Sequence, residues 1–175
     1  MANLNIRNLY YRWFVRRLER PCALPPGNRT KEATEQLRKY ETVLKEWKGK
    51  ERPQSMEEAL VLAELLMHQG LFFASHEFLE EFWRPATGEK RLAVHGIIQF
   101  AAAFHKLELN PGAAAGACEL LEKASAKLGA TGALGPGVGP ALADQADECR
   151  RALARGALDP LAAARRLNWT GRWSV

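Results

Sequence analysis

The sequence predicts an all-α protein, a compact bundle of about seven to eight helices without a sheet. Apolar residues recur at intervals of three and four along most of the chain, and Pro or Gly residues separate these segments. No stretch alternates apolar and polar residues as a half-buried strand does. With 175 residues, 47% of them hydrophobic, the chain can build a core and is not of the disordered class.

The N-terminal third predicts two basic helices. Residues 4–20 carry aromatic side chains at helical spacing, and the Pro- and Gly-containing residues 21–30 follow as a connector. Between Ala33 and Trp47, apolar residues at steps of four and three predict a second helix of about 18 residues. Ser55 and Glu58 then form a capping box at the start of the next helix, which Gly70 ends.

The rest of the chain predicts five more helices. The first runs from about Leu71 to Trp83 and the second over 89–109, which is apolar on several sides and is expected to be central. Asn110 and Pro111 fit the N-cap and first-turn positions of the following helix. The Gly- and Pro-rich segment 129–140 is expected to be a mobile surface loop. Another helix follows it, and Asp159 caps a short last one.

Charge divides the chain into parts. Residues 1–54 hold 13 Lys and Arg against 6 Asp and Glu, whereas residues 55–128 hold 6 against 10. We expect 1–54 to be a helical extension that packs on a core domain of residues 55–168. Its basic surface would bind nucleic acid or another acidic partner, pack on the acidic middle of the same chain, or simply be solvated. The aromatic N-terminus and the narrow apolar seams also allow a homodimer.

Several classes of protein are excluded or disfavoured. No apolar run is long enough to span a membrane, and arginines interrupt the N-terminal apolar stretches, so no secretory signal is expected. The three cysteines are far apart and read as free thiols, which favours the reducing cytoplasm. No glycine-rich cofactor motif is evident. Ser75 directly precedes His76, but adjacent residues of a helix point about 100° apart, so no nucleophile–base dyad is expected. The sequence names no reaction.

The segment FFASHEFLEEFW, residues 72–83, carries the candidate site. On a helical wheel His76 falls inside the apolar face, Glu80 lies one turn further along at its edge, and Glu77 lies at the rim. Trp83 is expected in the core, with Glu80 in range of its indole N–H. The cluster is either a structural His–Glu network or a polar pocket in the bundle core, in which Glu80 tunes His76 as a base or a ligand.

Two residues of the next helix complete the candidate pocket. His105 lies on an apolar face and is the expected partner across from His76, whereas Gln99 lies about 120° away on the same helix. His95 is expected at the surface or behind the site. A divalent metal is the group that His76, Glu80 and His105 would hold, although HExxE replaces the HExxH of zinc proteases.

These motifs resemble the family of domain of unknown function 309. Its pattern is a helix with His-Glu-x-Leu-Glu-x-x-Trp, then Gly-x-Ile-Gln-x-Ala-Ala-Ala and a His, then a Gly-Ala stretch. The matching positions are His76, Glu77, Leu79, Glu80, Trp83, Gly96, Ile98, Gln99, Ala101, Ala102, Ala103, His105, Gly112 and Ala113. The resemblance covers about residues 56–130 and implies a multihelical domain with no assigned activity.

Overall fold

The computed structural model describes residues 29–47 and 53–169. The chain divides into two compact units, Met1–Pro53 and Gln54–Val175. The described residues form seven α-helices and contain no strand, so the predicted all-α class is confirmed. Among these residues, no helix combines the length and the apolar character needed to cross a membrane.

The first unit contributes helix α2, Arg29–Glu46. Its first two residues, Arg29 and Thr30, belong to the expected connector 21–30, and the rest of that connector lies outside the described residues. Val43 and Trp47, which follow the apolar spacing of this segment, are buried. The helix expected over residues 4–20 lies outside the described residues.

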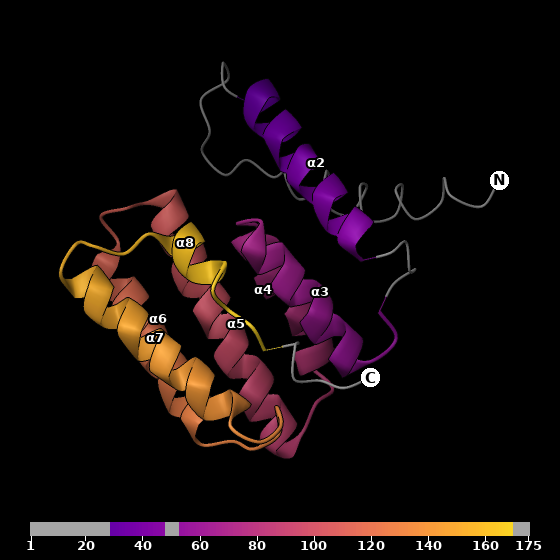
Figure 1. Ribbon diagram of the computed structural model, residues 1–175, viewed down its shortest axis with the longest axis vertical. Helices are drawn as coiled ribbons and strands as arrows, with labels where there is room; N and C mark the ends of the chain where they lie inside the picture. The colour runs from indigo at the N-terminus through magenta and orange to yellow at the C-terminus, as the bar shows by residue number, and fades with distance from the viewer. Residues whose placement is uncertain (1–28, 48–52, 170–175) are drawn as a thin grey trace. The chain divides into compact units, whose positions relative to one another are not determined.

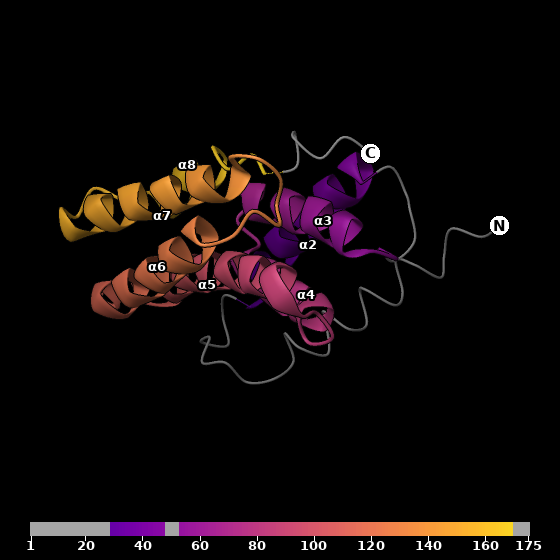
Figure 2. The same cartoon turned by 90° about the horizontal axis from the view of Figure 1, so that it is seen from below.

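The second unit is built around one long helix. Its elements are α3 (Met56–His68), α4 (Phe72–Trp83), α5 (Gly88–Leu109), α6 (Ala114–Gly129), α7 (Val138–Ala154) and α8 (Pro160–Ala164). α5 packs against both α4 and α6, while α3 covers α4 and α7 covers α6 (Figure 1). Seen from below, α4, α5 and α6 form one layer and α3, α7 and α8 the other (Figure 2).

The central position of α5 follows from its sequence, which is apolar on several sides. Ile97, Phe100 and Phe104 are almost completely buried. The Phe104 ring makes edge-on contacts with Phe100 of its own helix and Phe72 of α4, at centroid distances of 5.1 and 5.3 Å. These contacts join α4 to α5 in the core. They thereby determine which face of each helix is buried and which is exposed to solvent.

The predicted start and end of α3 are confirmed. The Ser55 hydroxyl accepts a hydrogen bond from the Glu58 N–H at 3.2 Å. The Glu58 carboxylate in turn accepts one from the backbone of Gln54 at 2.9 Å, one residue earlier than in a standard capping box. Gly70 has φ 72°, the left-handed conformation that favours glycine after a helix.

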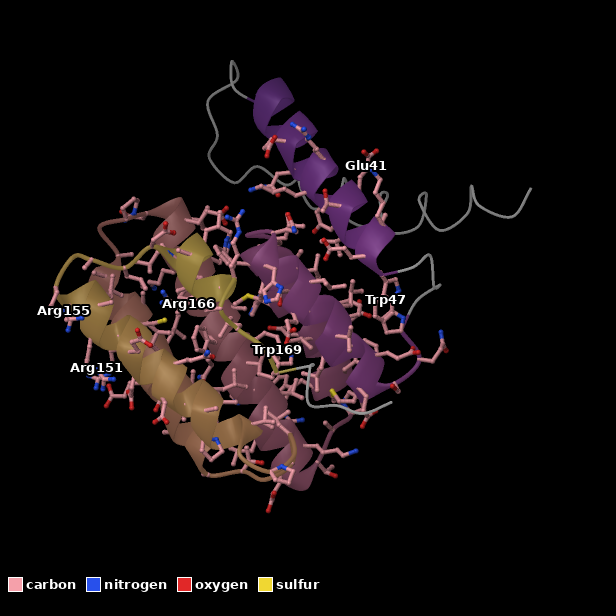
Figure 3. The ribbon with its side chains drawn as sticks, viewed as in Figure 1. Glu41, Trp47, Arg151, Arg155, Arg166 and Trp169 are labelled. Carbon is pink, nitrogen blue, oxygen red and sulfur yellow. The ribbon has the colours of Figure 1, made fainter. Side chains whose placement is uncertain are left out.

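The C-terminal segment is anchored on α3 by Trp169. Its backbone N–H donates to the buried carboxylate of Glu64 at 2.6 Å, and its indole N–H donates to the Leu60 carbonyl at 3.1 Å (Figure 3). The Asp159 carboxylate caps α8 as predicted, accepting from Leu161 and Ala162. These contacts attach the end of the described chain to its first core helix.

Two expectations for the chain after α5 are wrong in detail. Asn110 is the C-cap of α5, and its side chain accepts from the Gly112 N–H at 2.9 Å, so it closes a turn and does not cap α6. The segment 129–140 is only partly a loop, because Gly129 ends α6 and Val138 begins α7. Leu134 and Val138 are buried, which places part of this segment in the core.

Candidate functional site

The second turn of α4 brings His76, Glu77 and Glu80 together. His76 Nε2 lies 3.2 Å from Glu80 Oε1, and His76 Nδ1 lies 3.5 Å from Glu77 Oε1. One ligand atom from each residue falls within 4.8 Å of the others, and no other such trio of His, Cys, Asp or Glu occurs in residues 29–47 and 53–169. The helical spacing of i and i+4 accounts for the first contact. We call these three residues the His76 cluster.

The two oxygens of Glu80 have different partners. Oε1 faces His76, whereas Oε2 accepts a hydrogen bond from Arg84 Nη2 at 3.1 Å. Arg84 is one turn beyond Glu80, and its side chain is 71% exposed, so this pair lies at the surface. Glu80 therefore joins the His76 cluster to the C-terminal end of α4.

The His76 cluster lies at the edge of the bundle, whereas the sequence predicts a polar pocket in the bundle core. The side chains of His76, Glu77 and Glu80 are 23%, 13% and 27% exposed. The buried residues of α4 are Phe72, Ala74, Ser75, Phe78 and Leu79. His76 therefore lies away from the centre of the buried face of this helix. Solvent can reach all three polar groups.

Trp83 is half-buried at the end of α4 and does not have the partner expected of it. Glu80 is engaged by His76 and Arg84, and the buried Trp83 Nε1 has no hydrogen-bond acceptor among the described residues. The Trp83 ring instead packs against the His95 ring of α5 at a centroid distance of 4.9 Å. The guanidinium of Arg91 lies 4.1 Å from the centroid of the same indole.

Arg91 is a residue of this region that the sequence analysis missed. Its Nη1 donates to the carbonyl oxygens of Trp83, Arg84 and Ala86, at 3.1, 3.0 and 3.3 Å. These carbonyls lie at the end of α4 and in the turn to α5, beyond the regular i+4 hydrogen bonds of the helix. The Trp83 carbonyl also accepts from the Ala86 N–H at 3.1 Å. The sequence does show a basic residue early in the helix that follows the turn. It does not show that this side chain points back toward the end of α4.

His95 is placed between charges of both signs. Burial lowers the pKa of His95 below its usual value, the positive charges of Lys127 and Arg91 lower it further, and Glu80 acts in the opposite direction. His95 is half-buried, which agrees with the expected place at the surface or behind the site. His95 therefore contacts the Trp83 ring of α4 and is influenced by the charge of Lys127 of α6.

Gln99 and His105 lie on different sides of α5. Gln99 Oε1 accepts a hydrogen bond from Lys127 Nζ of α6 at 2.8 Å. The His105 ring packs on Phe73 of α4 at 4.9 Å, and its Nδ1 lies 3.4 Å from Glu108. Neither residue is in the His76 cluster, although the Phe73 ring also lies 6.3 Å from that of His76. The structure therefore brings together three of the six predicted pocket residues.

Other reactive side chains have structural surroundings. The Ser75 hydroxyl is buried and donates to the Ala63 carbonyl at 3.1 Å, so it ties α4 to α3. Cys149 is buried in α7 and Cys118 is half-exposed on α6, both as free thiols. Burial raises the pKa of Cys149 to about 11. These groups contribute nothing to the His76 cluster.

Comparison with known proteins gives one match. Residues 60–120 match the family model described as Domain of unknown function (DUF309). The chain matches no curated protein and no solved structure. The matched region contains all of α4 and α5, most of α3 and the beginning of α6, so it includes the His76 cluster, Trp83 and Arg91. The family whose model matches residues 60–120 is thus the one that the motif around His76 and Trp83 resembles.

Proposed function

We propose that the His76 cluster binds a divalent metal ion and that this is the function of the site. The observation that carries the proposal is the pairing of each ring nitrogen of His76 with a carboxylate oxygen, at 3.2 Å for Glu80 and 3.5 Å for Glu77. One residue type in the cluster supplies a nitrogen ligand and the other supplies oxygen ligands.

The separation of His76 Nε2 and Glu80 Oε1 suits two ligands of one ion. Ligand atoms about 2.0–2.2 Å from a tetrahedral ion lie about 3.3–3.6 Å apart, and these two atoms, 3.2 Å apart, are close to the lower end of that range. Glu77 then faces the other ring nitrogen. A carboxylate that accepts from Nδ1–H fixes the tautomer and orientation of a metal-bound imidazole. The remaining oxygen of Glu80 stays with Arg84, which makes Glu80 a ligand through one oxygen.

The donor set favours a borderline ion over a hard one. Imidazole suits Zn²⁺, Fe²⁺ and Ni²⁺, whereas sites built only from oxygen suit Mg²⁺ and Ca²⁺. At most three described side chains of the cluster can bind the ion, so positions remain for water or another ligand. Such an ion, when bound, polarises a ligand oxygen or activates water. The proposed function is metal binding, without an assigned reaction.

Calorimetric titration of the full chain with Zn²⁺ and with Mn²⁺, after removal of metal by a chelator, tests the proposal. We expect binding of one ion, lost in His76→Ala and weakened at least about 10- to 100-fold in Glu80→Gln, since loss of a residue that only orients a ligand already costs that much. Glu108→Gln is the matched control, because it removes a carboxylate that also faces a histidine but lies outside the cluster. His105→Ala tests the sequence-based prediction that His105 is a third ligand.

Equal affinity in the wild type and in His76→Ala would contradict the proposal. The His76 cluster would then be a structural network, the alternative that the sequence leaves open. Because its side chains are up to about a quarter exposed, His76→Ala would then lower the free energy of unfolding by only about 0.5–1 kcal/mol.

We further propose that the basic residues 1–54 bind nucleic acid or another acidic partner. The proposal is supported by their 13 Lys and Arg against 6 Asp and Glu. Affinity for a duplex DNA should then fall steeply as salt rises, and binding that does not respond to salt would contradict it. Cytoplasmic location, supported by the free thiols of Cys118 and Cys149, and a homodimer remain further proposals.

A further inference from the structure

Arg91 is held in place by one of its terminal nitrogens and has donors left over. Nη1 donates to three backbone carbonyls, and the guanidinium plane lies against Trp83. Nε and Nη2 have no acceptor among the described residues, and the side chain is half-buried. A guanidinium has five N–H groups in a planar fork, and two parallel donors of that fork match a carboxylate or a phosphate.

A second cation, Lys127 of α6, contacts the same helix as Arg91. Arg91, His95 and Gln99 follow one another at intervals of four on α5 and so share a face of that helix. Lys127 Nζ donates to Gln99 Oε1 at 2.8 Å, which places Lys127 beside the same face. Neither cation forms an ion pair with a carboxylate in the described part of the chain. The nearby carboxylate of Glu80 is already shared by His76 and Arg84. Two positive charges without a carboxylate partner therefore lie beside one face of α5.

We propose that Arg91, His95, Gln99 and Lys127 bind the oxyanion group of a small carboxylate or phosphate ligand on the outer face of α5. Arg91 supplies a fork that its backbone contacts already orient, and Lys127 supplies a point charge. A half-buried position strengthens both contacts relative to a fully exposed one. The Trp83 ring, which packs against His95 and under Arg91, forms the apolar side of the site.

The site is independent of the metal proposed for the His76 cluster. None of its four residues belongs to that cluster, and its observations are contacts on α5 and α6. Failure of metal binding would leave the anion site intact, and the reverse also holds. The test is therefore made on full-length protein in the presence of a chelator.

Titration with inorganic phosphate and, separately, with acetate tests the proposal, at an ionic strength held constant with chloride. The readout is the ¹H–¹³C signal of the His95 ring, assigned with His95→Gln. We expect one or both anions to shift this signal along a saturating curve. The anion whose curve saturates at the lower concentration, phosphate or acetate, shows whether the site prefers a phosphate or a carboxylate group. A dissociation constant near or below about 1 mM corresponds to the few kcal/mol that two charge-assisted contacts supply.

Variants separate a built site from general attraction of anions. Lys127→Met removes the charge and keeps the apolar stem, and it should weaken binding about 5- to 10-fold. Lys123→Met is the matched control, because Lys123 is an exposed lysine one turn earlier on α6, and it should change affinity less than about 2-fold. Arg91→Lys keeps a charge but loses the fork, and it should weaken binding at least as much as Lys127→Met.

Two results would overturn the inference. One is a His95 signal that responds no more to phosphate or acetate than to chloride. The other is equal weakening by Lys123→Met and Lys127→Met, which would show attraction by net charge alone. Because Arg91 also binds backbone carbonyls, Arg91→Lys is used only if its spectrum shows a folded protein. The comparison of Lys127→Met with Lys123→Met decides the question without it.

Discussion

The Arg91 guanidinium lies 4.1 Å from the centroid of the Trp83 ring and donates to the Trp83 carbonyl oxygen at 3.1 Å. One side chain of α5 thus holds both the ring and the backbone of the last residue of α4. The same nitrogen also binds the carbonyls of Arg84 and Ala86. The His76 cluster lies one to two turns earlier on α4, where the Phe72–Phe104 and Phe73–His105 contacts also join α4 to α5.

Arg91→Met is expected to lower the free energy of unfolding by about 1–3 kcal/mol, because hydrogen bonds from a charged group and a cation–π contact are lost together. Urea denaturation followed by circular dichroism measures the change. Lys90→Met is the control, since Lys90 makes only a surface ion pair with Glu57, and it should cost less than about 0.5 kcal/mol. Similar losses in both variants would show that Arg91 does not hold the end of α4.

Gly139→Ala should destabilise the protein by about 2 kcal/mol or more, because a new Cβ would have to displace backbone. That Cβ would lie 2.5 Å from the Leu128 carbonyl oxygen and 2.6 Å from that of Thr131. Gly129→Ala is the matched control: its Cβ would meet Ala143 at an ordinary 3.6 Å. Thermal denaturation of the two variants should separate them, and a Gly139→Ala protein as stable as Gly129→Ala would refute the close packing of α6 and α7.

Stability should rise with pH through the titration of His95. Its pKa in the folded chain is below the usual 6.5, mainly because of burial and then because of Lys127 and Arg91. The unfolded chain therefore binds more protons between the folded pKa and 6.5, so the free energy of unfolding increases with pH across that interval. Urea denaturation from pH 5 to 8 should show a smaller increase in His95→Gln. In Lys127→Met, NMR titration should give a higher pKa for His95; an unchanged or lower value would contradict the placement of Lys127.

Cys149 should resist alkylation in the folded protein. Burial raises the pKa of its thiol from 9.0 to about 11, so the reactive thiolate is rare at pH 8. Maleimide labelling followed by peptide mass spectrometry should find Cys118 modified well before Cys149, and equally fast labelling of the two would be the contrary result. Because the pKa is raised in the folded state, the stability that this thiol contributes is fully present below pH 9.0 and is lost as the pH rises toward 11.

Most of the fold of the second unit could be predicted from local sequence. Apolar spacing located its helices, and the signals at Ser55, Gly70 and Asp159 gave correct caps or ends, because each acts within a few residues. Asn110 was misassigned because one side chain fits both a turn after one helix and the cap of the next. The buried part of residues 129–140 was missed because composition does not show that Leu134 and Val138 reach the core.

The candidate site could be predicted only within one helix. The spacing of His76 and Glu80 predicted their contact, since residues i and i+4 share a helix face. The position of His105 relative to that face depends on how α5 rotates against α4, which the sequence does not give. The same rotation brings Arg91 and His95 to Trp83 and leaves His105 beside Phe73 and Glu108.

The most direct test of the account is the ¹⁵N NMR spectrum of the His76 ring as metal-free protein is titrated with Zn²⁺. Binding at the His76 cluster should move the Nε2 signal to that of a metal-bound nitrogen while Nδ1 keeps its proton beside Glu77. Glu80→Gln should require more Zn²⁺ for the same change. Both ring nitrogens of His76 unchanged at saturating Zn²⁺, or a change at His105 alone, would contradict the proposed metal site.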